Sequence, residues 1–121
     1  MEIKIKTTGS VVMTDELRAF IEKKLEKVSI FVRKDDAAIV EVEVGTTSAG
    51  QRTGDVYRAE AHITFSGGDV YADAITNTLH GAIDRAVSEA RRELKKKKGK
   101  DRDMVRKGAS EVKKFFRTFG K

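Results

Sequence analysis

The fold of this chain is decided by TLHGAIDRAVSEARRELKKKKGK, residues 78–100. Read at 3.6 residues per turn, its apolar side chains form one stripe: Leu79, Ile83, Ala86, Val87, Ala90 and Leu94. A helix over residues 78–98 would be about 31 Å long, enough to cross a small domain. Basic side chains lie off this stripe: Arg85, Arg92 and Lys96 on a second face, with Arg91, Lys95, Lys97 and Lys98 near the end. The stretch predicts a helix that packs on a core and turns a basic surface outward.

The chain before this helix alternates between strand and helix patterns. Residues 2–7 alternate apolar and charged side chains, which predicts a half-buried strand. Thr14 suits a helix N-cap, and an apolar stripe follows over residues 15–28. Three further strands are expected over residues 37–46, 56–65 and 69–75, with a hairpin loop over 45–55 and a tight turn at Gly67 and Gly68. The predicted class is α+β, with two helices on one face of a four-stranded sheet.

The opposite face of this sheet should be wet and mildly acidic. Alternation places mostly charged residues there: Glu2, Lys4, Glu41, Glu43, Glu60, His62 and Asp73. Tyr71 is the one aromatic residue expected to point outward, so a base-stacking platform is not predicted. The glutamates would suit a divalent ion in principle, but alternating Glu is typical of an exposed strand. His62 and His80 show no partner at ligand spacing, so we expect no enzyme, no metal and no cofactor.

Composition restricts the class of protein. A length of 121 residues suits one domain with at most a short appendage. The absence of cysteine excludes disulfides, thiolate zinc sites and thiol catalysis. No apolar run reaches the length of a membrane span, and the start MEIKIKTTG lacks the apolar segment of a signal peptide. We therefore expect a cytoplasmic protein.

The charge is distributed unevenly along the chain. Residues 1–74 carry 10 Lys or Arg against 13 Asp or Glu, whereas residues 75–121 carry 15 against 6. Such a basic block indicates a polyanionic partner, most often nucleic acid; the alternative is a solvated basic helix kept for solubility. If the two helices pack side by side, five basic residues would form one phosphate-binding surface: Lys24, Lys27, Arg85, Arg92 and Lys96. Interleaved glutamates could instead neutralise them.

Residues 99–121 form a basic, aromatic-containing C-terminal extension. Their apolar residues are roughly one-sided at helical spacing: Val105, Val112, Phe115, Phe116 and Phe119. The pattern fits a short amphipathic helix that folds back or meets a partner. It equally fits an arm that is disordered when free.

Three segments together resemble the family of ribosome hibernation promoting factors, also called ribosome-associated inhibitors or sigma-54 modulation proteins. They are IKTTGSVVMTDELRAFIEKKLEKV (residues 5–28), YRAEAHITFSGGDVYADAITNTLHGAID (57–84) and IDRAVSEARRELKKKK (83–98). The resemblance covers residues 1 to about 98, which it implies are a ribosome-binding domain. It implies the order β-α-β-β-β-α, similar to double-stranded RNA-binding domains. No catalytic signature is part of it.

The resemblance also implies a function. Members of this family bind the small ribosomal subunit of 70S ribosomes at the 16S rRNA around the decoding centre. There they block mRNA and the A- and P-site tRNA positions, which silences idle ribosomes under stress. Basic positions of the family pattern fall on Lys24, Lys27, Arg92 and Lys96. This sequence itself adds Arg85, Arg91 and Lys95 to the expected rRNA-binding residues.

Two other classes of function stay open. One is a generic double-stranded RNA-binding module that acts away from ribosomes, and the other is a protein-interaction domain. A small-molecule substrate and a membrane are not expected as partners. A homodimer is not implied, because the family's long form carries a separate dimerising domain that residues 99–121 do not resemble.

Overall fold

The computed structural model describes residues 1–32, 34–47 and 56–114, with side chains up to Gly99. The elements follow one another in the predicted β-α-β-β-β-α order. Their bounds are β1 Glu2–Thr7, α1 Asp15–Val32, β2 Ile39–Thr46, β3 Tyr57–Phe65, β4 Gly68–Thr76 and α2 Leu79–Lys114. The predicted α+β class is confirmed.

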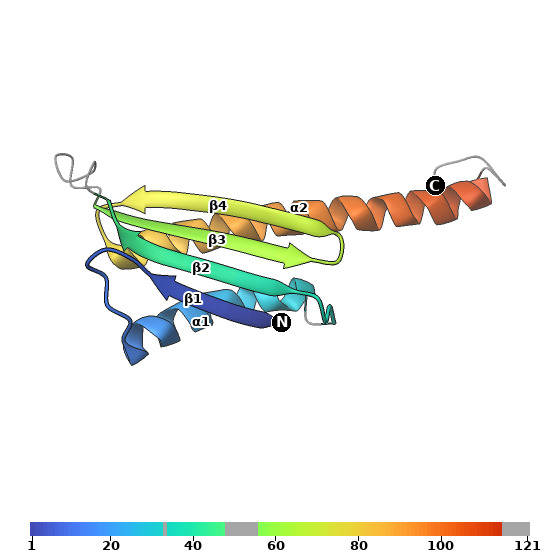
Figure 1. The fold of residues 1–121 in the computed structure, drawn as a ribbon. Helices are drawn as coiled ribbons and strands as arrows, with labels where there is room; N and C mark the ends of the chain where they lie inside the picture. Colours follow the sequence, from blue (N-terminus) through green and yellow to red (C-terminus); the bar gives the residue numbers. More distant parts are fainter. Residues whose placement is uncertain (33, 48–55, 115–121) are drawn as a thin grey trace.

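The four strands form one sheet in the order β1-β2-β3-β4 (Figure 1). β1 and β2 are parallel, because α1 crosses over one face of the sheet between them. The hairpins β2-β3 and β3-β4 make the remaining pairs antiparallel. β1 and β4 are therefore the two edges, and α2 runs along β4 on the same face as α1 (Figure 1).

The core lies between this face of the sheet and the two helices. Alternate residues of β2, β3 and β4 point into it, as the period of two requires. The largest fully buried side chains come from both helices and from β3: Ile21, Leu25, Ile63, Ile83 and Leu94. The apolar stripes predicted for the two helices are thus the surfaces that they bury, apart from the half-buried Phe20 and Leu79.

Threonine side chains begin both helices. Thr14 Oγ1 accepts a hydrogen bond from the Leu17 N–H at 3.0 Å, and Thr78 Oγ1 accepts one from the Gly81 N–H at 3.0 Å. Each bond satisfies an N–H that has no partner within its helix. The predicted N-cap at Thr14 and the predicted start of the second helix near Thr78 are confirmed.

Both helices are longer than the sequence indicated. α1 runs to Val32 instead of residue 28, because Val32 continues the buried stripe. α2 passes through Gly99 and ends at Lys114, so the extension begins as a continuation of α2. Glycine weakens a helix without ending it, and the chain contains no proline. Most of the expected loop (residues 48–55), the last residues (115–121) and the side chains of the extension lie outside the described residues.

Candidate nucleic-acid interface

The outer surface of the two helices holds the basic residues predicted from the sequence. Lys24 of α1 reaches across to Asp84 of α2, with 2.9 Å between Nζ and Oδ1. The same ammonium lies 5.4 Å from the centre of the Phe20 ring, which in turn packs edge-on against His80 at 4.2 Å between ring centres. These contacts join the N-terminal halves of the helices and hold Lys24, which is half-buried, in one place.

A second contact between a cation and an aromatic ring joins the helices nearer the C-terminal end of α1. The Arg91 guanidinium of α2 lies 5.9 Å from the centre of the Phe31 ring of α1. Its Nε is buried and has no hydrogen-bond partner among the described residues. This Nε is out of reach of an external ligand, but Arg91 as a whole is only half-buried, so its charge still contributes to this surface. Lys27 is exposed on α1, between the turns that carry these two contacts.

Arg85 and Lys95 complete the outward-facing set. Both are exposed on α2, and neither has an ion-pair partner within the described part of the chain. Lys95 follows Arg91 by one helical turn, which places it on the side of α2 that faces α1. The structure therefore brings together Lys24, Lys27, Arg91 and Lys95 along the line between the helices. Arg85 lies seven residues before Arg92 and is exposed on the face of α2 that also carries Arg92.

Arg92 and Lys96 lie on the other flank of α2. Arg92 lines a hollow of about 390 Å³ with Asp73 of β4, and Lys96 lines one of about 460 Å³ with Asp69 of β4. Lys96 is also 3.7 Å from Glu93. The sequence predicted these two residues beside Lys24 and Lys27. They instead face the β4 edge of the sheet. Adjacent positions of a helix point about 100° apart, so Arg92 and Lys96 lie on a different side of α2 from Arg91 and Lys95, which directly precede them.

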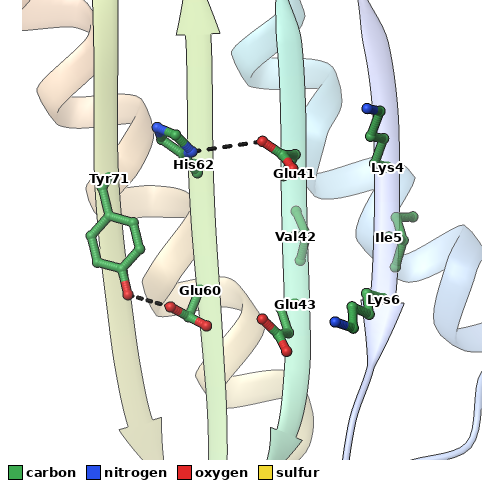
Figure 2. A pocket seen from close by; sticks show the side chains of 9 residues that line it. All are labelled: Lys4, Ile5, Lys6, Glu41, Val42, Glu43, Glu60, His62 and Tyr71. Atoms are coloured by element: carbon green, nitrogen blue, oxygen red, sulfur yellow. Dashed lines mark hydrogen bonds and ion pairs between the residues drawn. The ribbon is translucent and has the colours of Figure 1, made fainter.

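The open face of the sheet is polar, as predicted. A hollow of about 410 Å³ runs across all four strands and is lined by Lys4, Ile5, Lys6, Glu41, Val42, Glu43, Glu60, His62 and Tyr71 (Figure 2). Its described side chains include more acids than bases, so it offers an anion a weaker site than the helices do. Tyr71 points outward there and is half exposed.

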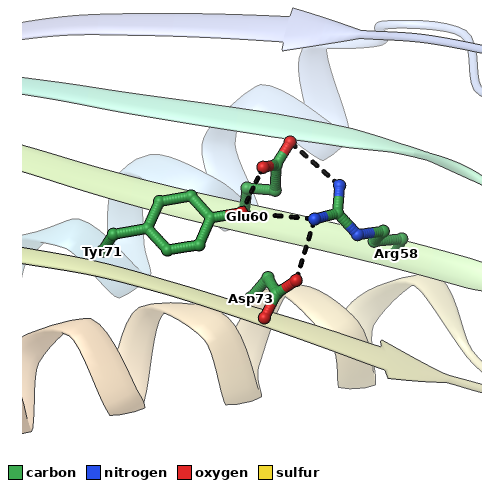
Figure 3. A network of polar contacts seen from close by, with 4 residues as sticks. All are labelled: Arg58, Glu60, Tyr71 and Asp73. Atoms are coloured by element: carbon green, nitrogen blue, oxygen red, sulfur yellow. Dashed lines mark hydrogen bonds and ion pairs between the residues drawn. The ribbon is translucent and has the colours of Figure 1, made fainter.

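Four residues of β3 and β4 form a network beside this hollow (Figure 3). Arg58 is 3.0 Å from Glu60 and 2.8 Å from Asp73, and it donates a hydrogen bond to the Tyr71 hydroxyl at 3.2 Å. The Tyr71 hydroxyl donates to Glu60, which lowers the pKa of the Glu60 carboxyl and raises the pKa of the tyrosine. Hydrogen bonds to Glu60 and Asp73 raise the pKa of Arg58. The network neutralises part of the acidic charge on β4.

His62 has carboxylate neighbours that its sequence spacing did not predict. Strand pairing places its Nε2 2.7 Å from Asp69 and its Nδ1 3.7 Å from Glu41, the contact drawn in Figure 2. No group of three or more potential metal ligands occurs within residues 1–32, 34–47 and 56–114. Among these same residues, neither helix combines the length and the apolar character of a membrane span.

Two residues of this surface were missed at the level of sequence. The apolar stripe predicted over residues 15–28 includes Phe20 as a buried residue, and it ends before Phe31. Both are half-buried and lie under a cation of the candidate interface. A signal was available, because the two residues lie three helical turns apart and so fall on one side of α1.

The chain matches a family model described as Sigma 54 modulation protein / S30EA ribosomal protein over residues 3–102. It is similar to the crystal structure of the Thermus thermophilus Protein Y N-terminal domain, with 26% identity and a TM-score of 0.65 over 79% of this chain and 98% of that one. It shares the fold of a ribosomal subunit interface protein from Coxiella burnetii, with 17% identity and a TM-score of 0.67 over 82% and 99% of the chains. None of the curated proteins matches it. The chain belongs to the Sigma 54 modulation protein / S30EA ribosomal protein family.

Proposed function

We propose that this protein inhibits translation by binding the small ribosomal subunit of idle 70S ribosomes. It contacts the 16S rRNA near the decoding centre with the outer surface of its helices, and so blocks mRNA and the A- and P-site tRNA positions. Membership of a family described as ribosomal supports a ribosomal partner. The rRNA contact is assigned to Lys24, Lys27, Arg85, Arg91, Arg92, Lys95 and Lys96.

The observation that carries this proposal is the separation of charge between the two faces of the molecule. Four of the seven basic residues lie along the line between the helices, and exposed Lys27, Arg85 and Lys95 have no ion-pair partner among the described side chains. The hollow on the open sheet face is lined by three glutamates against two lysines, whereas residues 79–99 of α2 carry seven Lys or Arg against three Asp or Glu. A polyanion therefore gains most by docking on the helices.

The geometry fits phosphate binding better than base recognition. Lysine ammonium groups act as point charges toward phosphates, and arginine adds two parallel donors. The aromatic rings of Phe20 and Phe31 are occupied by Lys24 and Arg91, so they position cations and do not offer free faces for bases. Binding should accordingly depend strongly on salt.

The test is co-sedimentation with vacant 70S ribosomes and separated subunits at several salt concentrations. Lys27→Glu/Lys95→Glu reverses two exposed charges at the helix surface and should weaken binding. Its salt dependence should fall by roughly 1.4 to 1.8 in log–log slope if both contact phosphates. Lys4→Glu/Lys6→Glu makes the same charge change on the open sheet face and should bind as the unmodified chain does.

Equal losses in the two variants would show that net charge alone drives binding, and would overturn the assigned surface. Loss of tRNA binding upon addition of the protein is expected at the small subunit. Equal affinity for naked duplex RNA and for ribosomes would instead identify a generic RNA-binding module.

A further inference from the structure

The outer edge of β4 has backbone groups available for another strand. β3 and β4 are joined by a two-residue turn, with Phe65 paired to Gly68. Alternation from this pair directs the N–H and C=O of Val70, Ala72 and Ala74 toward β3. The same groups of residues 71, 73 and 75 point away from the sheet. Lys97 Nζ donates to the Asp69 carbonyl at 3.3 Å, which agrees with this direction.

The side chains along this edge favour pairing. Within the described residues no strand lies outside β4, and its exposed large apolar side chains are Tyr71 and Ile75. Asp73 lies between them and is paired with Arg58 at 2.8 Å, although Arg58 also binds Glu60 at 3.0 Å, so the two Asp73 carboxylates that would face each other are only partly compensated. The other edge, β1, carries Lys4 and Lys6 at alternate positions, and lysines are typical of edges that avoid pairing.

The flank of α2 above this edge is complementary to itself. It presents alternating charges in the order Glu89, Arg92, Glu93, Lys96. If a second α2 lies antiparallel, Glu89 faces the partner's Lys96 and Arg92 faces the partner's Glu93. The middle of this series lies beside Asp73, since Arg92, Glu93 and Asp73 line the same hollow. A single two-fold axis can therefore relate both the two copies of β4 and the two copies of α2.

We propose that the β4 edge binds a second copy of this chain, with the two-fold axis at Asp73. The sheets then join into one of eight strands. Asp73 exchanges both backbone hydrogen bonds with its counterpart, and Tyr71 pairs with the partner's Ile75 on each side. Such an interface is isologous, so it closes at two copies and does not extend into a fibre.

The spacing of the helices agrees with this arrangement. α2 contacts both β3 and β4, so its axis lies roughly above the space between them. Adjacent strands are about 4.8 Å apart, which puts the two copies of α2 about 9.6 Å apart across the joined sheets. Helices pack at interaxial distances of about 8–10 Å, so this spacing is compatible with contact between the two charged flanks.

The first test is sedimentation velocity of the full chain over a wide range of concentration. The mass should rise from 13.5 kDa toward twice that value. Ile75→Lys places a lysine on the edge and should keep the mass at one chain. Ile30→Lys is the matched control, because Ile30 is similarly exposed but on α1, and it should dimerise normally. A mass of one chain at every concentration, or loss of the dimer in both variants, overturns the proposal.

Two further measurements test the register. In the dimer the amides of residues 71, 73 and 75 should exchange slowly, whereas dilution should restore fast exchange at these three positions alone. Arg92→Glu and Glu93→Arg should each weaken the dimer, because each brings like charges together across the axis. The double variant Arg92→Glu/Glu93→Arg should recover it. Failure of this recovery together with unprotected edge amides would exclude the β4 interface even if a dimer forms.

Discussion

At the scale of single residues, Asp35 joins two turns that are far apart in the chain. Its carboxylate accepts hydrogen bonds from the Ser66 N–H at 2.8 Å, the Ser66 hydroxyl at 2.7 Å and the Ala37 N–H at 3.0 Å. The bonds from Ser66 are the main reason that the pKa of Asp35 lies below its usual 3.8. The ionised carboxylate therefore stabilises the fold above about pH 3.8, and this stabilisation is lost as the pH falls through the lowered pKa.

Replacing Asp35 should consequently matter only where its carboxylate is ionised. Asp35→Asn should lower the urea midpoint of unfolding at pH 7, because the amide is a weaker acceptor for the two Ser66 donors. The gap from the unmodified chain should shrink as the pH falls below about 3.8. Asp36→Asn changes the exposed neighbour in the same turn and serves as the control. A gap that stays constant down to the acid limit would contradict this role.

At the scale of elements, the periodic patterns predicted the strands and both helix starts. The alternation of apolar and polar residues predicted the strands because it depends on which side of each strand faces the core. The helix starts were predicted because Thr14 and Thr78 cap the helices through local hydrogen bonds. The sequence patterns did not predict correctly where the two helices end. The pattern predicts an end of α1 at residue 28, but Val32 still faces the core, and the helix predicted to end at residue 98 continues through Gly99 to Lys114. Glycine lowers helix stability by about 1 kcal/mol, which is too little to end a helix by itself.

Gly99→Ala should therefore strengthen α2. An added Cβ meets no atom within 4 Å, so the gain in helix propensity of roughly 1 kcal/mol is not offset by a clash. Circular dichroism at 222 nm should deepen, and amides following residue 99 should exchange more slowly. Gly81→Ala is the contrasting variant, since its Cβ would lie 2.5 Å from Thr78 Oγ1 and disturb the cap. Unchanged helicity in Gly99→Ala would show that this glycine does not limit the helix.

At the scale of the whole molecule, charge blocks predicted a basic helical surface but not its division. Arg91 and Arg92 are neighbours in sequence, yet Arg91 faces Phe31 of α1 and Arg92 faces Asp73 of β4. Which residues take which side depends on how α2 is rotated over the sheet. That rotation is set by the buried stripe as a whole. The ion pair of Lys24 with Asp84, 60 positions away, likewise needs the packed helices.

This division gives the two proposals a common consequence. Arg92 and Lys96 are assigned to rRNA, and the same side chains face the partner chain in the β4 dimer. Side chains that pair with the partner chain are not available to phosphates, and the reverse is also true. Dimer formation and rRNA binding should therefore compete. By linkage, each should weaken the other by the same factor.

The competition is measured by titrating vacant small subunits with the protein below and above the concentration at which it dimerises. The unmodified chain should bind as one copy, with an apparent affinity that falls once the dimer forms. Ile75→Lys keeps Arg92 and Lys96 but blocks the edge, so its affinity should not change over this range. If Ile75→Lys binds normally and the unmodified chain binds as two copies, the dimer is compatible with rRNA and the competition is wrong. If neither chain binds, the ribosomal proposal fails while the dimer still stands on its own measurements.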